Sequence, residues 1–326
     1  MLDSPAPMKS LLSSRKTITG IIPVMLTPFT AHNEVDYAGL DRLTDWYLAS
    51  GADALFAVCQ SSEMQFLSLA EKVAIARHVV DRVAGRVPVL ASGHTGGSHE
   101  EQRDELVAVA GTGVDVLVLV TNRLDPDRLG EKVYRDRFAR LVDALPGSLP
   151  LGLYECPAPY RRLLSDAELT MAARSGRFVA LKDVSCDLGI VTRRAALTAA
   201  TPLAIINANA AIAYDAMRNG SSPGFCGVFT NFHPDLYAWL YRHREDDEEL
   251  ATDLAAFLAL AAMAEGMGYP ALAKRFHQRL GTFASAHSRA VTYDIAERFW
   301  ALDPILDIIQ STAERFRQRI RALPAK

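Results

Sequence analysis

Eight short apolar runs, each followed by a segment with helical spacing, recur between residues 20 and 245. Short apolar runs bounded by helical patterns are typical of parallel strands that are buried on both faces. A regular strand–helix alternation has two compact solutions, a closed (β/α)8 barrel and an open, doubly wound sheet. The runs are residues 21–26, 55–58, 87–91, 114–120, 149–154, 178–182, 203–207 and 225–229.

Three of the helical segments begin with a capping box, in which a serine accepts from the backbone three residues on and a glutamate reaches back. The pairs are Ser68 with Glu71, Ser98 with Glu101 and Ser165 with Glu168. The barrel is favoured over the open sheet because the strands are short and evenly spaced. The first strand also lacks the G-x-G-x-x-G turn of dinucleotide-binding sheets. We therefore predict an α/β fold, a (β/α)8 TIM barrel with a C-terminal helical extension.

The chain after residue 230 is helical in pattern to its end. Residues 235–244 would form the eighth barrel helix. The extension would consist of helices at 250–265, 271–280 and 292–321, with a hinge at 266–270. We accordingly divide the chain into a flexible N-terminal lead-in (1–18), the barrel (19–245) and the C-terminal helical extension (246–326).

Composition narrows the possible partners. The chain of 326 residues has a net charge of −3, so electrostatics give no reason to expect nucleic acid or an anionic membrane. No apolar run approaches the roughly 20 residues of a membrane span, and residues 1–16 have no signal-peptide pattern. We expect a cytoplasmic protein. Four cysteines without C-x-x-C spacing favour buried free thiols over a metal site; they are Cys59, Cys156, Cys186 and Cys226.

The strand at 178–182 ends on a lysine after four apolar residues. An ammonium group is almost never fully buried without a partner. Lys182 is therefore paired, reaches water, or is kept for chemistry. Desolvation lowers the pKa of a lysine and frees its amine as a nucleophile, as in Schiff-base enzymes. The adjacent Asp183 is expected to face the other side of the strand and to have an outward salt partner.

Barrel enzymes place their sites at the carboxyl ends of the strands. Tyr154 ends the fifth predicted strand, and Gln60, Ser61 and Ser62 follow the second. An amine, a phenol and hydroxyl groups at one barrel mouth suit an imine-forming site: the lysine attacks a ketone, the tyrosine shuttles protons, and hydroxyls with backbone N–H groups hold a carboxylate.

Each of these residues also has a structural interpretation. Tyr154 could be an aromatic residue that ends a strand with its hydroxyl in water. Ser61 and Ser62 could form a turn or a helix N-cap. Cys226 could be a packed thiol that contributes only its backbone. His94, which follows the third strand, is expected to be a solvated loop histidine rather than a pocket residue.

The combination of motifs resembles the dihydrodipicolinate synthase / N-acetylneuraminate lyase family. The resemblance covers roughly residues 19–231, and it identifies this chain as a divergent member of the family. The resemblance begins with the opening Gly-Ile-Ile-Pro-Val-Met-Leu-Thr-Pro-Phe (20–29) and continues with the spacing of Glu63, Leu67 and Glu71. Leu-Tyr-Glu-Cys-Pro (153–157) stands where Tyr-Asn-x-Pro is usual in the family. Val-Ala-Leu-Lys-Asp (179–183) and residues 224–231 complete the match.

The resemblance implies a role for several residues. Lys182 would form the imine with pyruvate or another 2-oxo acid, and Tyr154 would donate and accept protons. Ser61 would hold the carboxylate through its hydroxyl and backbone N–H, and the backbone around Cys226 would line the same pocket. The substrate-binding set so predicted is Gln60, Ser61, Ser62, Ala208 and Cys226. The resemblance implies no metal or organic cofactor, and a homotetramer or homodimer.

The sequence departs from the family pattern around the relay residues. The usual Gly-Thr-Thr-Gly-Glu turn is here Cys-Gln-Ser-Ser-Glu (59–63). Gln60 replaces the first hydroxyl, and an amide cannot pass a proton as a hydroxyl does. Two glycines are lost, so the turn must differ or accept side chains at its tight positions. Residues 121–126 contain no tyrosine, whereas many family members carry a second relay tyrosine there.

The specificity residues depart as well. Pro159 stands where dihydrodipicolinate synthases have an arginine for the carboxylate of the second substrate, and Arg161 or Arg162 is the candidate replacement. Residues 208–210, Ala-Asn-Ala, lack the acids with which sialic acid lyases hold the sugar chain.

Three functional hypotheses of different kinds follow. The leading one is a class I lyase, an aldolase or dehydratase that acts on a 2-oxo acid through an imine at Lys182; the alternative within enzymes is dihydrodipicolinate synthesis proper. The second is a barrel that has lost turnover and binds a 2-oxo acid as a regulatory protein. The third, a phosphate-binding barrel, ranks last because no glycine-rich loop follows the seventh strand.

Overall fold

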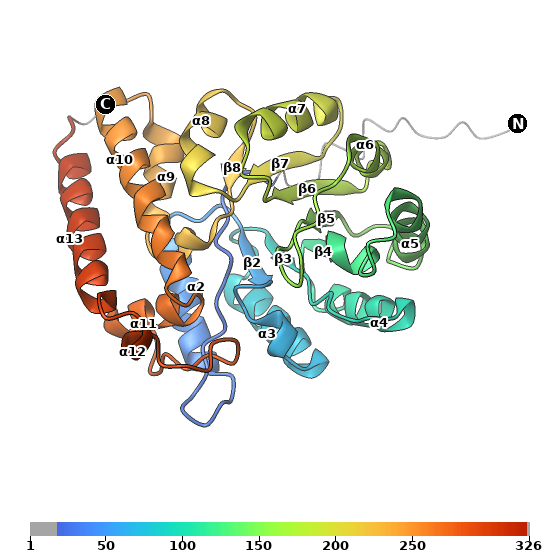
Figure 1. Cartoon of the computed structure of the whole chain (residues 1–326), viewed down its shortest axis with the longest axis horizontal. Helices are drawn as coiled ribbons and strands as arrows, with labels where there is room; N and C mark the ends of the chain where they lie inside the picture. The colour runs from blue at the N-terminus through green and yellow to red at the C-terminus, as the bar shows by residue number, and fades with distance from the viewer. Residues whose placement is uncertain (1–17, 325–326) are drawn as a thin grey trace, which may run out of the picture.

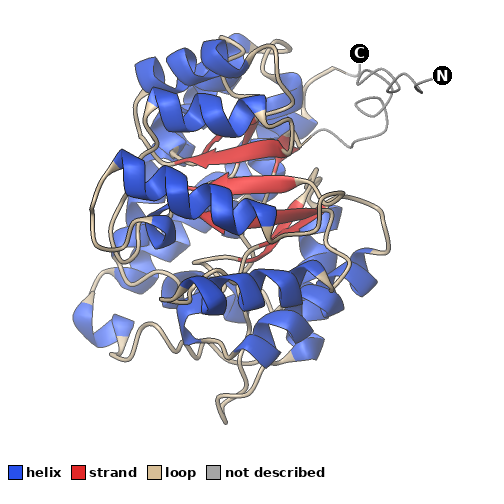
Figure 2. Ribbon diagram, turned by 90° about the vertical axis from the view of Figure 1, so that its right-hand side faces the viewer, coloured by secondary structure: helices blue, strands red, loops and turns tan. Residues whose placement is uncertain are grey.

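Eight parallel strands form the centre of the part of the chain that the computed structural model describes, residues 18–324 (Figures 1 and 2). They are β1 (Gly20–Ile21), β2 (Leu55–Val58), β3 (Val89–Ala91), β4 (Val116–Val120), β5 (Leu151–Tyr154), β6 (Phe178–Asp183), β7 (Ala204–Asn207) and β8 (Gly224–Phe225). Strands β2 to β8 pair in chain order, and β8 pairs with β1. Val24 forms a parallel bridge with Phe56 of β2, which closes the ring. The predicted barrel is confirmed, and the open sheet is excluded.

A helix follows each strand and packs outside the ring, as Figure 2 shows. These helices are α2 (Tyr37–Ala49), α3 (Leu69–Val83), α4 (His99–Ala110), α5 (Glu131–Asp143), α6 (Asp166–Arg174), α7 (Leu188–Thr198), α8 (Ala213–Arg218) and α9 (Pro234–His243). The three predicted capping boxes form at the starts of α3, α4 and α6. Local sequence therefore determines where these helices begin, because each box satisfies backbone N–H groups that the helix itself cannot.

The C-terminal helices stack on one side of the barrel (Figure 1). They are α10 (Glu248–Ala261), the 3-10 turn η5 (Ala262–Gly266), α11 (Ala271–Arg279), α12 (Ile295–Arg298) and α13 (Leu302–Arg321). Helix α10 packs against the turn η3 (Ala210–Ile212), which follows β7. The chain bends by 115° between η5 and α11. The extension therefore reaches the carboxyl ends of the strands.

The predicted helix at 292–321 is wrong in one respect, because the structure breaks it at residues 299–301. Pro304 explains the break. Proline has no N–H to donate and is tolerated only in the first turn of a helix, where that N–H would be unsatisfied anyway. Helix α13 begins at Leu302, which places Pro304 in its first turn.

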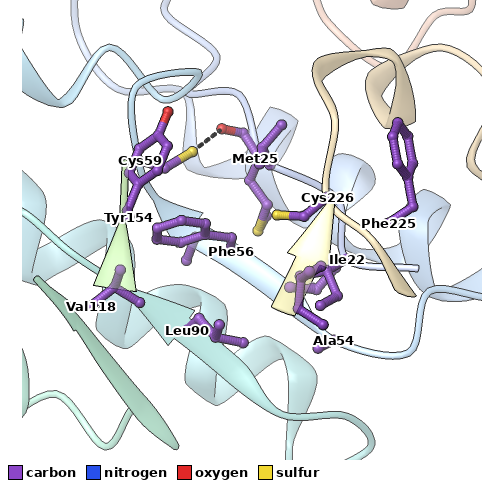
Figure 3. Close-up of a cluster of buried hydrophobic side chains, with 14 of the residues drawn as sticks. Ile22, Met25, Ala54, Phe56, Cys59, Leu90, Val118, Tyr154, Phe225 and Cys226 are labelled. Carbon is purple, nitrogen blue, oxygen red and sulfur yellow. Dashed lines mark hydrogen bonds between the residues drawn. The ribbon is translucent and has the colours of Figure 1, made fainter. Parts of the chain in front are cut away.

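The interior of the barrel is an apolar core (Figure 3). Leu90 and Val118 lie in its lower part, and Cys226 is only 3% exposed among these side chains. The Tyr154 ring packs edge-on against Phe56, with 5.7 Å between ring centroids, and its hydroxyl points away from Leu90 and Val118.

Of the predicted lead-in, residues 1–17 lie outside the described residues, and Ile18 is buried. Within the described range, no one helix combines the length and the apolar character that crossing a membrane demands. A bent pair, Glu248–Gly266 with Ala271–Arg279, does so by length and composition only.

Three histidines are fully shielded from water, and the expectation of a solvated His94 is wrong. The Nδ1 atom of His94 accepts from the Val120 backbone N–H at 3.0 Å, and Nε2 lies 2.9 Å from the side-chain oxygen of Gln102. The ring is therefore held neutral inside the protein, away from the cavity described below. Burial lowers the pKa of His94 to about 4 and the pKa values of His233 and His277 to about 3.

We expect acid to destabilise the fold through these rings. The unfolded chain binds protons on histidine near pH 6.5 and the folded chain does so only at much lower pH. The stabilisation is therefore complete above about pH 6.5 and is lost as the pH falls, toward about 4 for His94 and about 3 for His233 and His277. The loss is roughly 1.4 kcal/mol per group and pH unit. Chemical denaturation at a series of pH values measures this slope. His94→Gln should remove about one third of this slope, because His233 and His277 remain, whereas His32→Gln at an exposed position should leave it unchanged. An equal slope in both variants contradicts the assignment.

Candidate active site

Lys182 and Tyr154 are neighbours across two paired strands. In the β5–β6 register, Tyr154 lies opposite Lys182, and both side chains point to the inside of the barrel. The Nζ atom of Lys182 is 4.6 Å from the centroid of the Tyr154 ring. The parallel pairing of two buried strands therefore brings together the two residues that the sequence predicts as catalytic.

The next residue on each strand faces the other way. Glu155 and Asp183 are fully buried and both pair with Arg194 of α7. The guanidinium donates to Glu155 at 2.7 and 3.0 Å and also to Asp183 and to the Leu164 carbonyl. The predicted outward partner of Asp183 is thus Arg194. By binding both carboxylates, Arg194 ties the ends of β5 and β6 together on the outer side of the barrel.

Lys182 has no anionic partner within the described residues. Its side chain is 7% exposed, and no carboxylate of residues 18–324 lies within ion-pair distance of Nζ. The nearest aspartate in sequence, Asp183, is bound to Arg194. No carboxylate therefore competes with a substrate for the amine.

Tyr154 is 3% exposed and directs its hydroxyl toward Gln60. The O–H donates to the side-chain oxygen of Gln60 at 3.5 Å, and the thiol of Cys156 donates to the same oxygen at 3.1 Å. Burial raises the pKa of the Tyr154 phenol well above its ordinary value. The phenol is therefore held in its protonated form, as a hydrogen-bond donor at the edge of the site.

A cavity of about 740 Å³ opens above these residues. Its lining includes Lys182 and Tyr154 together with Gln60, Ser61 and Ala208. Three of the five predicted substrate-binding residues thus line one space with the two predicted catalytic residues. A cavity of this size is in the range of sites that hold small organic ligands.

Ser62 and Cys226 lie outside this cavity. The Ser62 hydroxyl lies 2.8 Å from the carbonyl oxygens of both Met25 and Ala57 and accepts from the Cys59 N–H at 3.0 Å. Its hydrogen bonds hold the turn, so the structure does not support substrate binding by Ser62. The Cys226 side chain lies among the apolar side chains of the barrel core (Figure 3), where burial raises its pKa to about 11.

The turn at residues 59–63, which has no glycine where the family pattern has two, adopts a left-handed backbone conformation at one residue. Within 59–63 only Glu63 has positive φ, at 60°. A buried ion pair with Lys274 of α11 holds this residue, and its second oxygen accepts from the backbone N–H groups of Arg289 and Ala290 at 2.6 Å. Burial lowers the pKa of Lys274 to about 8, with Glu63 opposing the shift. Long-range contacts, rather than glycine, therefore fix this turn.

The structure distinguishes the two candidate arginines. Arg162 is bound to Glu168 at 2.6 and 3.0 Å and stacks on Tyr134, so it serves the scaffold. Arg161 lines the cavity and donates to the carbonyls of Val184 and Ser185. It is exposed and has no carboxylate partner among residues 18–324.

The sequence analysis missed two cavity residues with polar side chains in the C-terminal extension, Tyr269 and Glu265. The Tyr269 hydroxyl accepts from the Asn231 side-chain nitrogen at 2.9 Å. Burial raises the pKa of the Tyr269 phenol well above its ordinary value, against a hydrogen bond with Ser61. The cavity thus holds a second phenol. Nothing in the sequence marks Tyr269 as a cavity residue, because residues 266–270 have only the pattern of a turn.

Within residues 18–324, no group of three or more His, Cys, Asp or Glu side chains is arranged to hold a metal ion. All four cysteines are free thiols: Cys59, Cys156 and Cys226 are buried as expected, but Cys186 is exposed and lines the cavity.

The sequence matches the dihydrodipicolinate synthetase family over residues 17–297. The 4-hydroxy-tetrahydrodipicolinate synthase of Polynucleobacter asymbioticus is 32% identical over 178 residues, which are 54% of this chain and 55% of the relative. That of Bacillus subtilis is 33% identical over 172 residues, 52% and 57% of the two chains. The chain therefore spans little more than half the length of the curated relatives that it matches.

Solved structures match over more of the chain. Dihydrodipicolinate synthase DapA-2 of Bacillus anthracis has a TM-score of 0.80 and 22% identity, and the match covers 89% of this chain and 97% of that one. YagE of E. coli K12, a prophage protein of the same family solved with pyruvate, has a TM-score of 0.79 and 22% identity, covering 92% and 98%. At these identities the likeness establishes the fold.

Proposed function

The chain belongs to the dihydrodipicolinate synthetase family, and we propose that it acts there as a class I lyase on pyruvate or another 2-oxo acid. The observation that carries this proposal is that Lys182 and Tyr154 lie next to each other in the lining of one cavity, with no carboxylate of the described residues in an ion pair with the amine. The reaction is the making or breaking of a carbon–carbon or carbon–oxygen bond next to an imine.

The first step is attack of the Lys182 amine on the ketone carbon. The ketone oxygen leaves as water once it has been protonated, and an imine remains. Ser61 supports binding of the substrate carboxylate in two ways. It lines the cavity, and its backbone N–H has no acceptor among residues 18–324. A free N–H beside a hydroxyl is a suitable donor pair for a carboxylate.

Tyr154 supplies the proton for this step. Its phenol is protonated and oriented by Gln60, so it can donate to the oxygen of the carbinolamine as that oxygen leaves. The phenolate that results can then take a proton from the carbon next to the imine, which gives the enamine. Gln60 orients the phenol but does not pass protons, because an amide oxygen only accepts.

Dihydrodipicolinate synthesis proper is the second candidate. The names of the curated relatives favour it, and Arg161 gives the cavity a guanidinium for the carboxylate of a second substrate. The absence of an arginine at Pro159 argues for a different second substrate, and the absence of a tyrosine in 121–126 removes a relay residue that many family members carry.

Borohydride reduction in the presence of pyruvate tests the proposal. We expect the protein to gain the mass of one reduced pyruvate unit, located on Lys182 by peptide mapping, because borohydride converts the imine to a stable secondary amine. Lys182→Ala should gain nothing, and Lys132→Ala, at a lysine on the surface of α5, should behave like the unchanged protein. An unmodified protein, or an adduct at another lysine, would favour a barrel without imine chemistry.

A further inference from the structure

The turn that contains Ser61 is closed by two backbone hydrogen bonds. The Ser62 N–H donates to the Cys59 carbonyl at 3.2 Å, and the Glu63 N–H donates to the Gln60 carbonyl at 2.9 Å. Ser61 is a central residue of both closed loops, and its own N–H has no acceptor among residues 18–324. The direction of this N–H therefore depends on how the two ends of the turn are held.

The carboxylate at the far end of the turn binds to the C-terminal extension. One oxygen of Glu63 forms a fully buried ion pair with Nζ of Lys274 on α11. The other oxygen accepts from the Ser288 hydroxyl at 2.9 Å and from the Arg289 and Ala290 N–H groups at 2.6 Å. Within residues 18–324, every partner of this carboxylate belongs to the extension. The barrel therefore depends on the extension for the conformation of Glu63.

Glu63 needs this support because its backbone is left-handed. Its φ is 60°, in a region that residues with a Cβ rarely adopt. Such a conformation persists where the surrounding structure holds it. Nζ of Lys274 also donates to the His287 carbonyl at 2.9 Å and lies 4.1 Å from the centroid of the Phe29 ring. The cation that holds Glu63 is thus itself fixed by two further contacts.

The same segment of the extension reaches the turn a second time, at Ser61. Tyr269 lies on the bend that leads into α11, and its hydroxyl accepts from the Asn231 side-chain nitrogen at 2.9 Å. The phenol also has a hydrogen bond with Ser61. Residues 269–274 therefore contact the turn both at Ser61 and at Glu63.

A second buried lysine provides a comparison within the same chain. Lys72 on α3 pairs with Glu105 at 2.8 Å and donates to the Gly93 carbonyl at 3.2 Å. In the described part of the chain, neither Lys72 nor Glu105 lines the cavity or has a hydrogen bond with residues 59–63. The two lysine–glutamate pairs are alike in chemistry but differ in the segment that they hold.

We propose that Lys274 is a positioning residue for the substrate carboxylate: through its ion pair with Glu63, it holds Ser61 with its N–H and hydroxyl directed into the cavity. This inference rests on the proposed function, in which Ser61 binds the carboxylate of a 2-oxo acid. Without the ion pair, Glu63 relaxes from its left-handed conformation and the Ser61 N–H turns away. The effect falls on carboxylate binding and not on the amine, because Lys182 lies on β6.

The first test compares two ketones that differ in their charge, pyruvate and its methyl ester. Cyanoborohydride traps the imine at Lys182, and the trapping rate is measured over a range of ketone concentrations. We expect Lys274→Met to raise the half-saturating concentration of pyruvate by about ten-fold or more, as for loss of hydrogen bonds to a charged group. The maximal rate and the half-saturating concentration of the ester should stay within about two-fold.

Lys72→Met is the matched control. It also breaks a buried ion pair and should lower stability, but it should leave the half-saturating concentrations of both ketones unchanged. A merely structural role of Lys274 predicts a lower amplitude of trapping for both ketones and no change in half-saturation. That result, or the same rise for both ketones in Lys274→Met, would overturn the inference.

The second test needs no imine and no change at Lys274. Burial lowers the pKa of Lys274 to about 8, so the ion pair is intact below this pH and is lost as the pH rises through it. In Lys182→Ala, we expect the dissociation constant of pyruvate, measured by NMR, to rise about five-fold between pH 7 and pH 9. Adding Lys274→Met should remove this dependence.

The groups around Nζ leave Lys274 as the one that titrates in this range. Glu63 and Arg289 are the charged groups that act on it, and Arg289 is paired on its other side with Glu71. The His287 ring packs edge-on against Phe29, and the range lies above the ordinary pKa of histidine, about 6.5. An affinity that does not change with pH, or no binding of pyruvate at any pH, overturns the inference. Absence of a trapped adduct with both ketones overturns the imine chemistry alone, because the binding measurement does not use it.

Discussion

Tyr154→Phe is expected to slow the exchange of the pyruvate methyl protons with D₂O by a factor of about 10²–10⁴, the usual contribution of a positioned acid–base group. The exchange requires an imine, loss of a proton from the neighbouring carbon and its return from solvent. It therefore reports on the proposed role of Tyr154 without a second substrate. NMR follows the loss of the methyl signal.

The physical reason lies in how the phenol is held. Tyr154 is packed against Phe56 and directed at Gln60, and Phe keeps the packing while removing the hydroxyl. The reduced adduct on Lys182 should still form on long incubation, since the amine is unchanged. Tyr293→Phe, at an exposed tyrosine of the extension, is the control and should exchange at the rate of the unchanged protein. Equal rates in both variants would remove Tyr154 from the reaction.

Arg194→Leu is expected to lower the free energy of unfolding by about 3–5 kcal/mol, the usual loss when one partner of a buried ion pair is removed. Arg194 is 1% exposed and neutralises Glu155 and Asp183, both fully buried. Burial already raises the pKa of Glu155 even with Arg194 present, so without the guanidinium two carboxyl groups remain uncompensated. Chemical denaturation at neutral pH measures the loss.

The neighbouring residue on α7 offers a matched control. Arg193 is exposed and pairs with Asp166 at the surface, so Arg193→Leu should change stability by less than about 1 kcal/mol. Adding Glu155→Gln and Asp183→Asn to Arg194→Leu removes the stranded charges and should recover part of the loss. A small effect of Arg194→Leu alone, or no recovery in the triple variant, would show that the three residues do not act as a charge network.

The sequence alone does not predict which of two adjacent residues lines the cavity. Ser61 and Ser62 are adjacent and chemically the same, yet Ser61 lines the cavity and Ser62 bonds to the backbone of the turn. Nothing in the sequence separates them, because the difference is set by the path of a turn whose Glu63 is anchored by Lys274 in the extension. The burial of His94 is hidden in the sequence for the same reason, because its partners, Val120 and Gln102, come from other elements.

The sequence by itself determined the barrel, the starts of several helices and the pairing of Lys182 with Tyr154. Each depends on short-range rules: apolar runs form buried strands, capping boxes begin helices, and the ends of neighbouring parallel strands meet. Only the tertiary structure decided that Glu265 and Tyr269 join the cavity and that Arg161, not Arg162, faces it. Those placements follow from how the C-terminal helices and the loops pack on the barrel, and such contacts between distant segments leave no periodic signal in the sequence.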